Sequence, residues 1–168
     1  MASTFRDRLA LDETFGAWFD QTRRYMLIRP EALMGIFSRL APEPRLLALS
    51  ALEDSIFEQG SDSARAYRSM GGTGESLLDV IAASAPQLGW GQWQFERHGS
   101  MLALGVRNSP FAAGYGPSTT PVCAAITGMM RAVSTLVFDR PCHAREVQCA
   151  ATGAEDCRFE AQPQEAGS

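Results

Sequence analysis

Lysine is absent from the chain, and histidine occurs only as His98 and His143. The 168 residues carry a formal net charge of −4, and arginines scattered along the sequence supply all of the positive side-chain charge. Domains that bind nucleic acid or an anionic membrane usually gather basic residues on one face, so we expect neither partner. Because no leader pattern, lipidation motif or membrane-spanning apolar run is present, we also expect a cytoplasmic protein.

The common catalytic and nucleotide-binding motifs are missing too. No HExxH motif, no dinucleotide fingerprint and no ordered Ser-His-Asp series stands out. The glycine-rich stretch Gly71–Glu75 lacks the following Lys-Ser/Thr of a phosphate-binding loop, and no strong strand precedes it. We therefore expect a turn there, with Thr73 as the N-cap of a helix that runs to about Ala85.

Four cysteines are present, all in the last third of the chain: Cys123, Cys142, Cys149 and Cys157. In the cytoplasm they should be reduced, which favours metal ligation or core packing over disulfides. Cys149 and Cys157 flank Gly153, so a turn could bring both sulfurs to one ion, and Cys123 would approach from the start of a helix. Tetrahedral Zn²⁺ uses thiolates with an oxygen or imidazole donor. Since no CxxC pair is present, packing as buried thiols is an equal alternative on spacing alone.

The fourth ligand stays open on spacing alone. Glu146 and Cys149 have opposite parity, so in a regular strand they would point to opposite faces. A bulge or strand end near residues 147–148 would bring them to one face. His143 and Cys142 are the competing donors.

The hydrophobic pattern predicts a helical N-terminal half. Aromatic and apolar residues set among charges from Phe5 to Arg24 indicate an amphipathic helix, which either packs on the domain or seals a second subunit. A short apolar strand over 25–28 stops at Pro30. Further helices are expected over 31–40, over 45–59 with Gly60 closing it, and through Tyr67.

From Gly89 the hydrophobic period changes to two, which predicts a hairpin with strands over 90–97 and 101–107. Trp90 and Trp93 have opposite parity, so only Trp93 should face the core, together with Phe95. The following loop, 108–117, carries Phe111 and Tyr115. It is a candidate lid over a pocket, or else an ordinary connection whose aromatic residues fill the core.

An apolar helix over 122–138, capped by Thr120, should form the centre of the core, followed by strands over 144–150 and 157–161. The predicted fold is α+β: a helical N-terminal half packed on an antiparallel meander of about four strands, with the long core helix crossing it. The predicted organisation is an N-terminal helical extension (1–24) that is a candidate dimer contact, one domain (25–161) and a disordered tail (162–168).

Several of these residues together resemble the 4-vinyl reductase domain family. The pattern runs Pro121-Val122-Cys123, a helix with Gly128 in its first half, Arg140-Pro141, and then Glu146-x-x-Cys149-x-x-x-Gly153-x-x-x-Cys157-Arg158-Phe159; Arg24–Glu31 also resembles the family's usual start. The family includes bacteriochlorophyll 4-vinyl reductase-like proteins and the sensor domains of phenol-responsive transcription activators. Since the phenol-sensor members hold zinc at these positions, the resemblance implies zinc ligands at Cys123, Glu146, Cys149 and Cys157.

We interpret the chain as a ligand-binding homodimer with a structural zinc rather than as an autonomous enzyme. The resemblance implies a hydrophobic aromatic or tetrapyrrole-like ligand, and we place it by position against Trp93, Phe95, Phe111 and Tyr115. One alternative is a role in 4-vinyl reduction during bacteriochlorophyll biosynthesis, as catalyst or substrate carrier. However, no site for a nicotinamide or flavin is evident in the sequence. A second alternative is a protein-interaction module with a filled core, related in fold to vesicle-tethering subunits.

Overall fold

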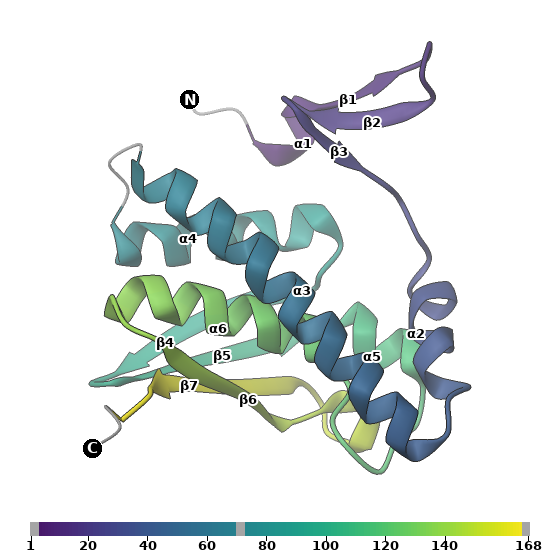
Figure 1. The fold of residues 1–168 in the computed structure, drawn as a ribbon, viewed down its shortest axis with the longest axis vertical. Helices are drawn as coiled ribbons and strands as arrows, with labels where there is room; N and C mark the ends of the chain where they lie inside the picture. Colours follow the sequence, from purple (N-terminus) through teal and green to yellow (C-terminus); the bar gives the residue numbers. More distant parts are fainter. Residues whose placement is uncertain (1–3, 70–72, 166–168) are drawn as a thin grey trace.

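The computed structural model describes residues 4–69 and 73–165. A four-stranded antiparallel sheet forms one layer, helices cover one of its faces, and a small N-terminal sheet stands apart from this body (Figure 1). The predicted α+β class is confirmed. The elements are α1 (Phe5–Arg8), β1 (Leu9–Asp12), β2 (Ala17–Asp20), β3 (Arg23–Tyr25), α2 (Pro30–Ser38), α3 (Pro42–Ser69), α4 (Gly74–Ser84), the 3-10 helix η1 (Pro86–Leu88), β4 (Gln92–His98), β5 (Met101–Arg107), α5 (Pro110–Tyr115), α6 (Ala124–Phe138), β6 (Cys142–Gln148), the 3-10 helix η2 (Ala150–Thr152) and β7 (Cys157–Pro163).

The predicted amphipathic helix over Phe5–Arg24 is wrong, because only α1 is helical and the rest forms the antiparallel sheet β1-β2-β3. Turn chemistry explains the difference. The Asp12 carboxylate accepts hydrogen bonds from the N–H groups of Thr14 (2.9 Å) and Phe15 (3.2 Å), and Gly16 adopts a positive φ of 61°. This local turn reverses the chain and breaks the helical pattern.

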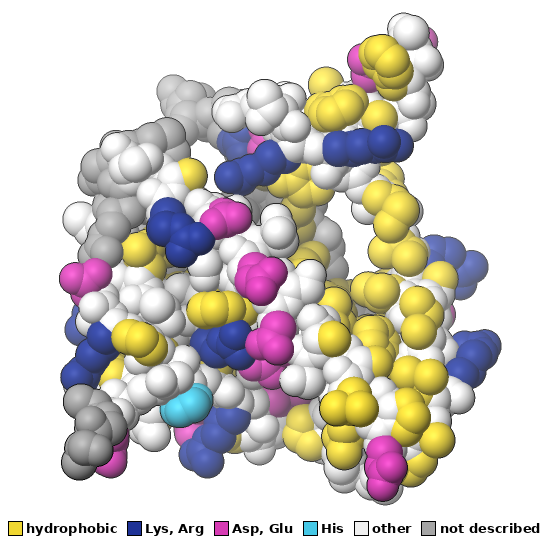
Figure 2. All heavy atoms as spheres, viewed as in Figure 1, with side chains coloured by type: hydrophobic (Ala, Val, Ile, Leu, Met, Phe, Trp, Pro, Cys, Tyr) yellow, Lys and Arg dark blue, Asp and Glu magenta, His cyan; other side chains and the backbone are white. Residues whose placement is uncertain are grey.

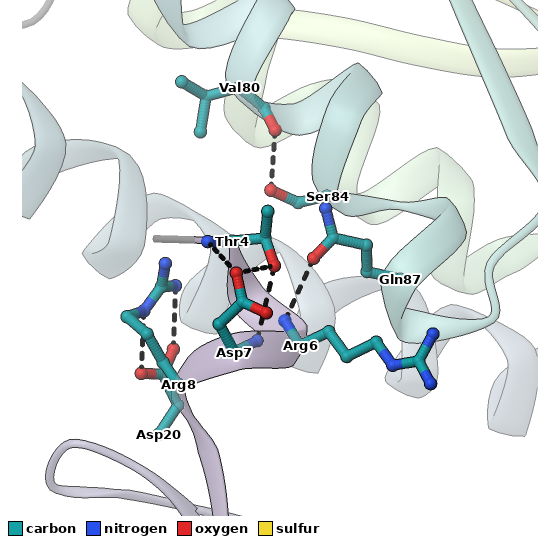
Figure 3. Close-up of polar contacts among 8 residues, drawn as sticks. All are labelled: Thr4, Arg6, Asp7, Arg8, Asp20, Val80, Ser84 and Gln87. Carbon is teal, nitrogen blue, oxygen red and sulfur yellow. Dashed lines mark hydrogen bonds and ion pairs between the residues drawn. The ribbon is translucent and has the colours of Figure 1, made fainter. Parts of the chain in front are cut away.

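Polar contacts hold the N-terminal segment together and tie it to the body (Figure 3). Arg8 donates two hydrogen bonds of 3.0 Å to the carboxylate of Asp20, from α1 to the end of β2. The backbone N–H of Arg6 donates to the side-chain oxygen of Gln87 in η1 at 3.0 Å. The strand expected over 25–28 starts earlier, as β3, and residues 26–29 form an extended linker to α2.

Helix α3 is one continuous helix, although a break at Gly60 was expected. Its packing against α6 accounts for the glycine: a Cβ at Gly60 would lie 3.1 Å from the sulfur of Met129. At the same crossing, a Cβ on Gly128 of α6 would lie 2.2 Å from the carbonyl oxygen of Glu53. The two glycines therefore let the helix backbones approach closely, and this packing outweighs the low helix propensity of glycine.

The sheet has the order β4-β5-β7-β6, with every neighbouring pair antiparallel. The predicted hairpin is confirmed, but the predicted meander is wrong in order, because β5 pairs with β7. Since α5 and α6 lie between β5 and β6 in the chain, the chain re-enters the sheet at its edge. Gln162 and Pro163, assigned to the tail from the sequence, belong to β7.

Helix α6 lies between the sheet and α3, as predicted for the core helix (Figure 1). It begins at Ala124 with Cys123 as N-cap, so the expected capping role of Thr120 is wrong. Thr73 does cap α4 through its side chain, as predicted, whereas Gly71 and Gly72 lie outside the described residues. Among the described helices, none is both long and apolar enough to cross a membrane.

Candidate metal centre

Four acidic side chains from separate stretches of the chain meet at the start of α6. Cys123 is the N-cap of that helix, Glu146 lies in β6, Cys149 follows β6, and Cys157 begins β7. One ligand atom from each lies within 4.8 Å of all the others. The three cysteines are fully buried. The structure thus brings together all four residues that the family resemblance implicates.

A β-bulge resolves the parity problem of Glu146 and Cys149. In the pairing of β6 with β7, Glu146 is opposite Phe159 and Gln148 is opposite Arg158, so Val147 is an extra residue. The extra residue lets Glu146 and Cys149 point to the same face of the sheet. This is the irregularity that the sequence required near residues 147–148.

The spacing of these atoms fits a tetrahedral metal site. The sulfur of Cys123 lies 3.7 Å from that of Cys157 and 4.0 Å from that of Cys149. Thiolates around Zn²⁺, with bonds of about 2.3 Å, are about 3.8 Å apart in a regular tetrahedron. One carboxylate oxygen of Glu146 accepts a hydrogen bond from the Cys123 N–H at 2.8 Å, while the other, Oε1, is buried without a hydrogen-bond partner. A Cys₃Glu group with such an unpaired oxygen could hold a metal ion.

The crowding of these groups changes their pKa values in opposite directions. Burial, assisted by the neighbouring side chain of Cys149, raises the pKa of Glu146 to about 8. Hydrogen bonds from Cys123 and Cys149 lower the pKa of Cys157 to about 4, and the pKa of Cys123 rises because its thiol is the donor and is buried. The metal-free group therefore stores protons that a cation would displace.

Backbone and hydroxyl groups surround the sulfurs. The N–H of Ala150, at the start of η2, donates to the Cys157 sulfur at 3.3 Å. The hydroxyl of Ser109 lies 3.3 Å from the Cys123 sulfur and is buried. Sequence reasoning missed Ser109, because the fold alone brings it near a cysteine 14 positions later.

The two competing donors lie elsewhere. His143 is exposed on β6, and Cys142 is buried with its thiol 3.4 Å from the carbonyl oxygen of Arg140. Among the described residues, the group of potential ligands contains neither of them.

The proposed ligand-lining residues are partly brought together. The rings of Trp93 and Phe95 are 6.0 Å apart, and Phe111 meets Trp90 edge to face at 5.1 Å. The Trp93 indole N–H donates to the carbonyl oxygen of Trp90 at 2.9 Å. Tyr115 packs against the core from the end of α5. Trp90, Trp93, Phe95 and Phe111, which we call the aromatic cluster, therefore fill one side of the core.

The expectation that Trp90 faces away from the core is wrong. Trp90 precedes β4 and is followed by Gly91, whose φ of 88° breaks the alternation of side chains. A Cβ on Gly91 would also lie 2.6 Å from the carbonyl oxygen of Arg107. The parity of a strand therefore cannot be extended back to Trp90.

The loop expected to form a lid contains the short helix α5. Two hollows lie at the surface of the described part of the body. One, of about 370 Å³, is on the uncovered face of the sheet and is lined by polar and charged side chains such as Gln94, Glu96 and Arg158. The other is an open groove of about 640 Å³ between α5 and η2 that reaches Ser109. Of these two, the groove is the one beside the cysteines.

Comparison with known proteins places this architecture. Residues 102–163 match the family model of the vinyl-4-reductase domain, so the resemblance to the 4-vinyl reductase domain family is confirmed for this part of the chain. No curated protein sequence matches the chain.

Solved structures share the fold over most of the chain. The phenol-responsive sensory domain of the transcription activator PoxR, crystallised with phenol, aligns over 97% of this chain and 92% of its own, with 17% identity and a TM-score of 0.76. A trafficking protein particle complex subunit 3 from Naegleria fowleri, covalently bound to palmitic acid, aligns over 81% and 95%, with 11% identity and a TM-score of 0.57. A vinyl-4-reductase family protein from Methanocaldococcus jannaschii aligns over 84% and 98%, with 15% identity and a TM-score of 0.54. At these identities the comparison establishes the fold.

Proposed function

We propose that the protein is a small-molecule-binding domain whose Cys123, Glu146, Cys149 and Cys157 hold one structural Zn²⁺. The observation that carries this proposal is the convergence of three buried sulfurs and an unpaired carboxylate oxygen at tetrahedral spacing. Four protein ligands would leave no open position for chemistry, as in structural zinc sites. The bound cation would neutralise the crowded group and join α6 to β6 and β7.

The ligand we propose is a hydrophobic aromatic or tetrapyrrole-like compound that enters at the aromatic cluster. The fold shared with a sensory domain crystallised with phenol supports an aromatic ligand. Trp93 and Phe111 are buried and packed among other rings, so an aromatic compound could replace ring-to-ring contacts by similar ones. Tyr115 and Phe95 would border this site.

Native mass spectrometry of protein purified without added metal tests both parts of the proposal. We expect about one zinc per chain, and a retained aromatic or tetrapyrrole mass would identify the ligand. Folded protein without metal, with its thiols free, would overturn the zinc site. A retained flavin or nicotinamide would instead favour participation in 4-vinyl reduction.

Tryptophan emission tests the ligand site directly. Phenol, polycyclic aromatics and tetrapyrroles should be titrated against the wild type, Trp93→Phe and Phe111→Ala. A saturable change that Trp93→Phe largely removes supports the site, and Phe111→Ala should shift the preference toward larger compounds because it opens space. If no compound gives a saturable change, the aromatic cluster is simply a filled core.

A second candidate function, protein interaction, rests on an exposed apolar surface. Hydrophobic side chains gather along the linker and over the corner between α2 and α3 (Figure 2). In the linker, Met26 and Leu27 have exposed fractions of 78% and 74%. A surface of this kind usually marks an interface. The apolar surface consists of Met26, Leu27, Ile28, Ile36, Leu46 and Leu47.

We propose that a second copy of the chain covers this apolar surface, giving a homodimer. An opening remains between the N-terminal sheet, the linker and the body when all atoms are drawn (Figure 2). A partner that enters there would contact the linker, which the chain itself leaves exposed. The dimer contact thus moves from the predicted helix over Phe5–Arg24 to the linker and the α2–α3 corner.

A further inference from the structure

The hydroxyl group of Ser109 stands between the metal centre and helix α5. Ser109 is 3% exposed, and its Oγ lies 3.3 Å from the sulfur of Cys123. The same oxygen accepts a hydrogen bond of 3.4 Å from the backbone N–H of Ala112, which makes Ser109 the N-cap of α5. One buried oxygen atom therefore contacts both a candidate metal ligand and the first turn of a helix.

The backbone around Ser109 fixes the position of this hydroxyl. Asn108 adopts a left-handed conformation with φ of 59°, and Pro110 occupies the first position of α5. Proline restricts the preceding residue to extended conformations, and Ser109 has φ of −62° and ψ of 121°. Because these neighbours leave little freedom, the hydroxyl cannot move away from Cys123 without moving α5.

Hydrogen-bond inventory gives the contact a direction once a metal is bound. A metal-bound Cys123 is a thiolate, which has no proton to donate, so the Ser109 hydroxyl must be the donor to sulfur. Its lone pairs remain free to accept from Ala112. A hydrogen bond of this kind lowers the electron density on the sulfur and orients it toward the metal.

Helix α5 is in turn packed firmly against the proposed ligand site. Its Phe111 ring contacts Trp90, and a Cβ on Gly114 would lie 2.5 Å from the carbonyl oxygen of Pro30 in α2. After α5, the N–H of Ser118 donates to the carbonyl oxygen of Ala151 in η2 at 2.8 Å. The α5 segment is thus linked to the metal group at both ends, through Cys123 and through the turn between Cys149 and Cys157.

We propose that Ser109 is a positioning residue that holds the Cys123 thiolate and couples metal occupancy to the placement of α5 beside the aromatic cluster. The proposal rests on the metal site of the proposed function. An aromatic compound that displaces Phe111 would shift the Ser109 hydroxyl relative to sulfur, and loss of the metal would loosen α5.

Cobalt(II) in place of zinc provides the spectroscopic test on the full chain. Removing a hydrogen bond from a thiolate raises the energy of its lone pairs, so Ser109→Ala should move the sulfur-to-cobalt charge-transfer band to longer wavelength. It should also speed Co²⁺ loss to a chelator about tenfold, as expected for an outer-shell partner. Ser109→Thr keeps the hydroxyl and should restore the wild-type band and rate.

Thr73→Ala is the matched control, because Thr73 caps α4 in the same manner. Its helix start lies against Val137, near the end of α6 remote from Cys123. We expect this variant to lose stability but to keep the wild-type band and rate. If Ser109→Ala behaves in the same way, Ser109 is only a helix cap and the proposal is overturned.

Hydrogen exchange at the amides of residues 111–115 tests the coupling. Zn²⁺ should slow exchange there in the wild type and have no effect on α5 in Ser109→Ala. Wild-type exchange that ignores Zn²⁺, despite stoichiometric binding, would overturn the coupling alone. If the wild type binds neither Co²⁺ nor Zn²⁺, the proposed metal site itself fails, so the two failures are distinguishable.

Discussion

The carboxylate of Glu146 accepts a hydrogen bond from the backbone N–H of Cys123 at 2.8 Å. An edge-strand residue thereby supplies an anion to the start of the core helix, where unpaired N–H groups favour negative charge. The other oxygen of the same carboxylate is free for a cation. Glu146 therefore serves the fold and the candidate metal centre through different atoms.

Cysteine substitutions should separate a metal ligand from a buried thiol. Cys149→Ala should lower the free energy of unfolding by about 4 kcal/mol or more, because it removes a ligand and with it the metal. Cys142→Ala, also buried but outside the group, should cost about 1 kcal/mol. In urea unfolding, a chelator should destabilise the wild type and Cys142→Ala but not Cys149→Ala. Equal tolerance of both substitutions would contradict a metal role for Cys149.

Proton release on Zn²⁺ binding should reveal whether Glu146 is a ligand. Since its pKa is raised to about 8, the metal-free carboxyl carries a proton at pH 7 and must lose it to bind the cation. Glu146→Gln should therefore release about 0.9 fewer protons than the wild type at pH 7. At pH 9 the carboxyl is already ionised, and the difference should fall to about 0.1. A pH indicator in weak buffer measures this, and an unchanged count at pH 7 would exclude Glu146 as a ligand.

The crossing of α3 and α6 should not tolerate a side chain at Gly128. Although alanine has the higher helix propensity by about 1 kcal/mol, its Cβ would lie 2.2 Å from the Glu53 carbonyl oxygen. We expect Gly128→Ala to destabilise the protein by about 3 kcal/mol in chemical denaturation. Gly105→Ala is the control: its Cβ has 4.0 Å to the nearest atom, so it should be neutral or stabilising by about 0.5 kcal/mol.

A charge on the linker should dissociate the proposed homodimer. Light scattering of the wild type should give twice the chain mass of 18.2 kDa. Leu27→Glu should give the monomer, because burial of an unpaired carboxylate opposes association. Val80→Glu, at an exposed apolar position on α4, should leave the dimer intact. A monomeric wild type would remove the idea, and a dimeric Leu27→Glu variant would place the interface elsewhere.

Local chemistry in the sequence was sufficient for several elements. The alternation over 92–107 predicted the hairpin β4–β5, and Thr73 predicted the start of α4, because period and capping depend on residues close together in the chain. The four candidate ligands followed from their spacing together with the family resemblance. Spacing alone could not choose Glu146 over His143, since that choice depends on a bulge.

Tertiary structure decided what local patterns could not. Gly60 reads as a helix end in the sequence, but the close approach of α6 keeps α3 continuous. The segment over Phe5–Arg24 has helical apolar spacing, yet the Asp12 turn and strand pairing win there. Ser109 meets Cys123, and Trp90 meets Phe111, only because the fold brings distant residues together. Backbone packing and strand pairing are non-local energies, so short-range periodicity carries no record of them.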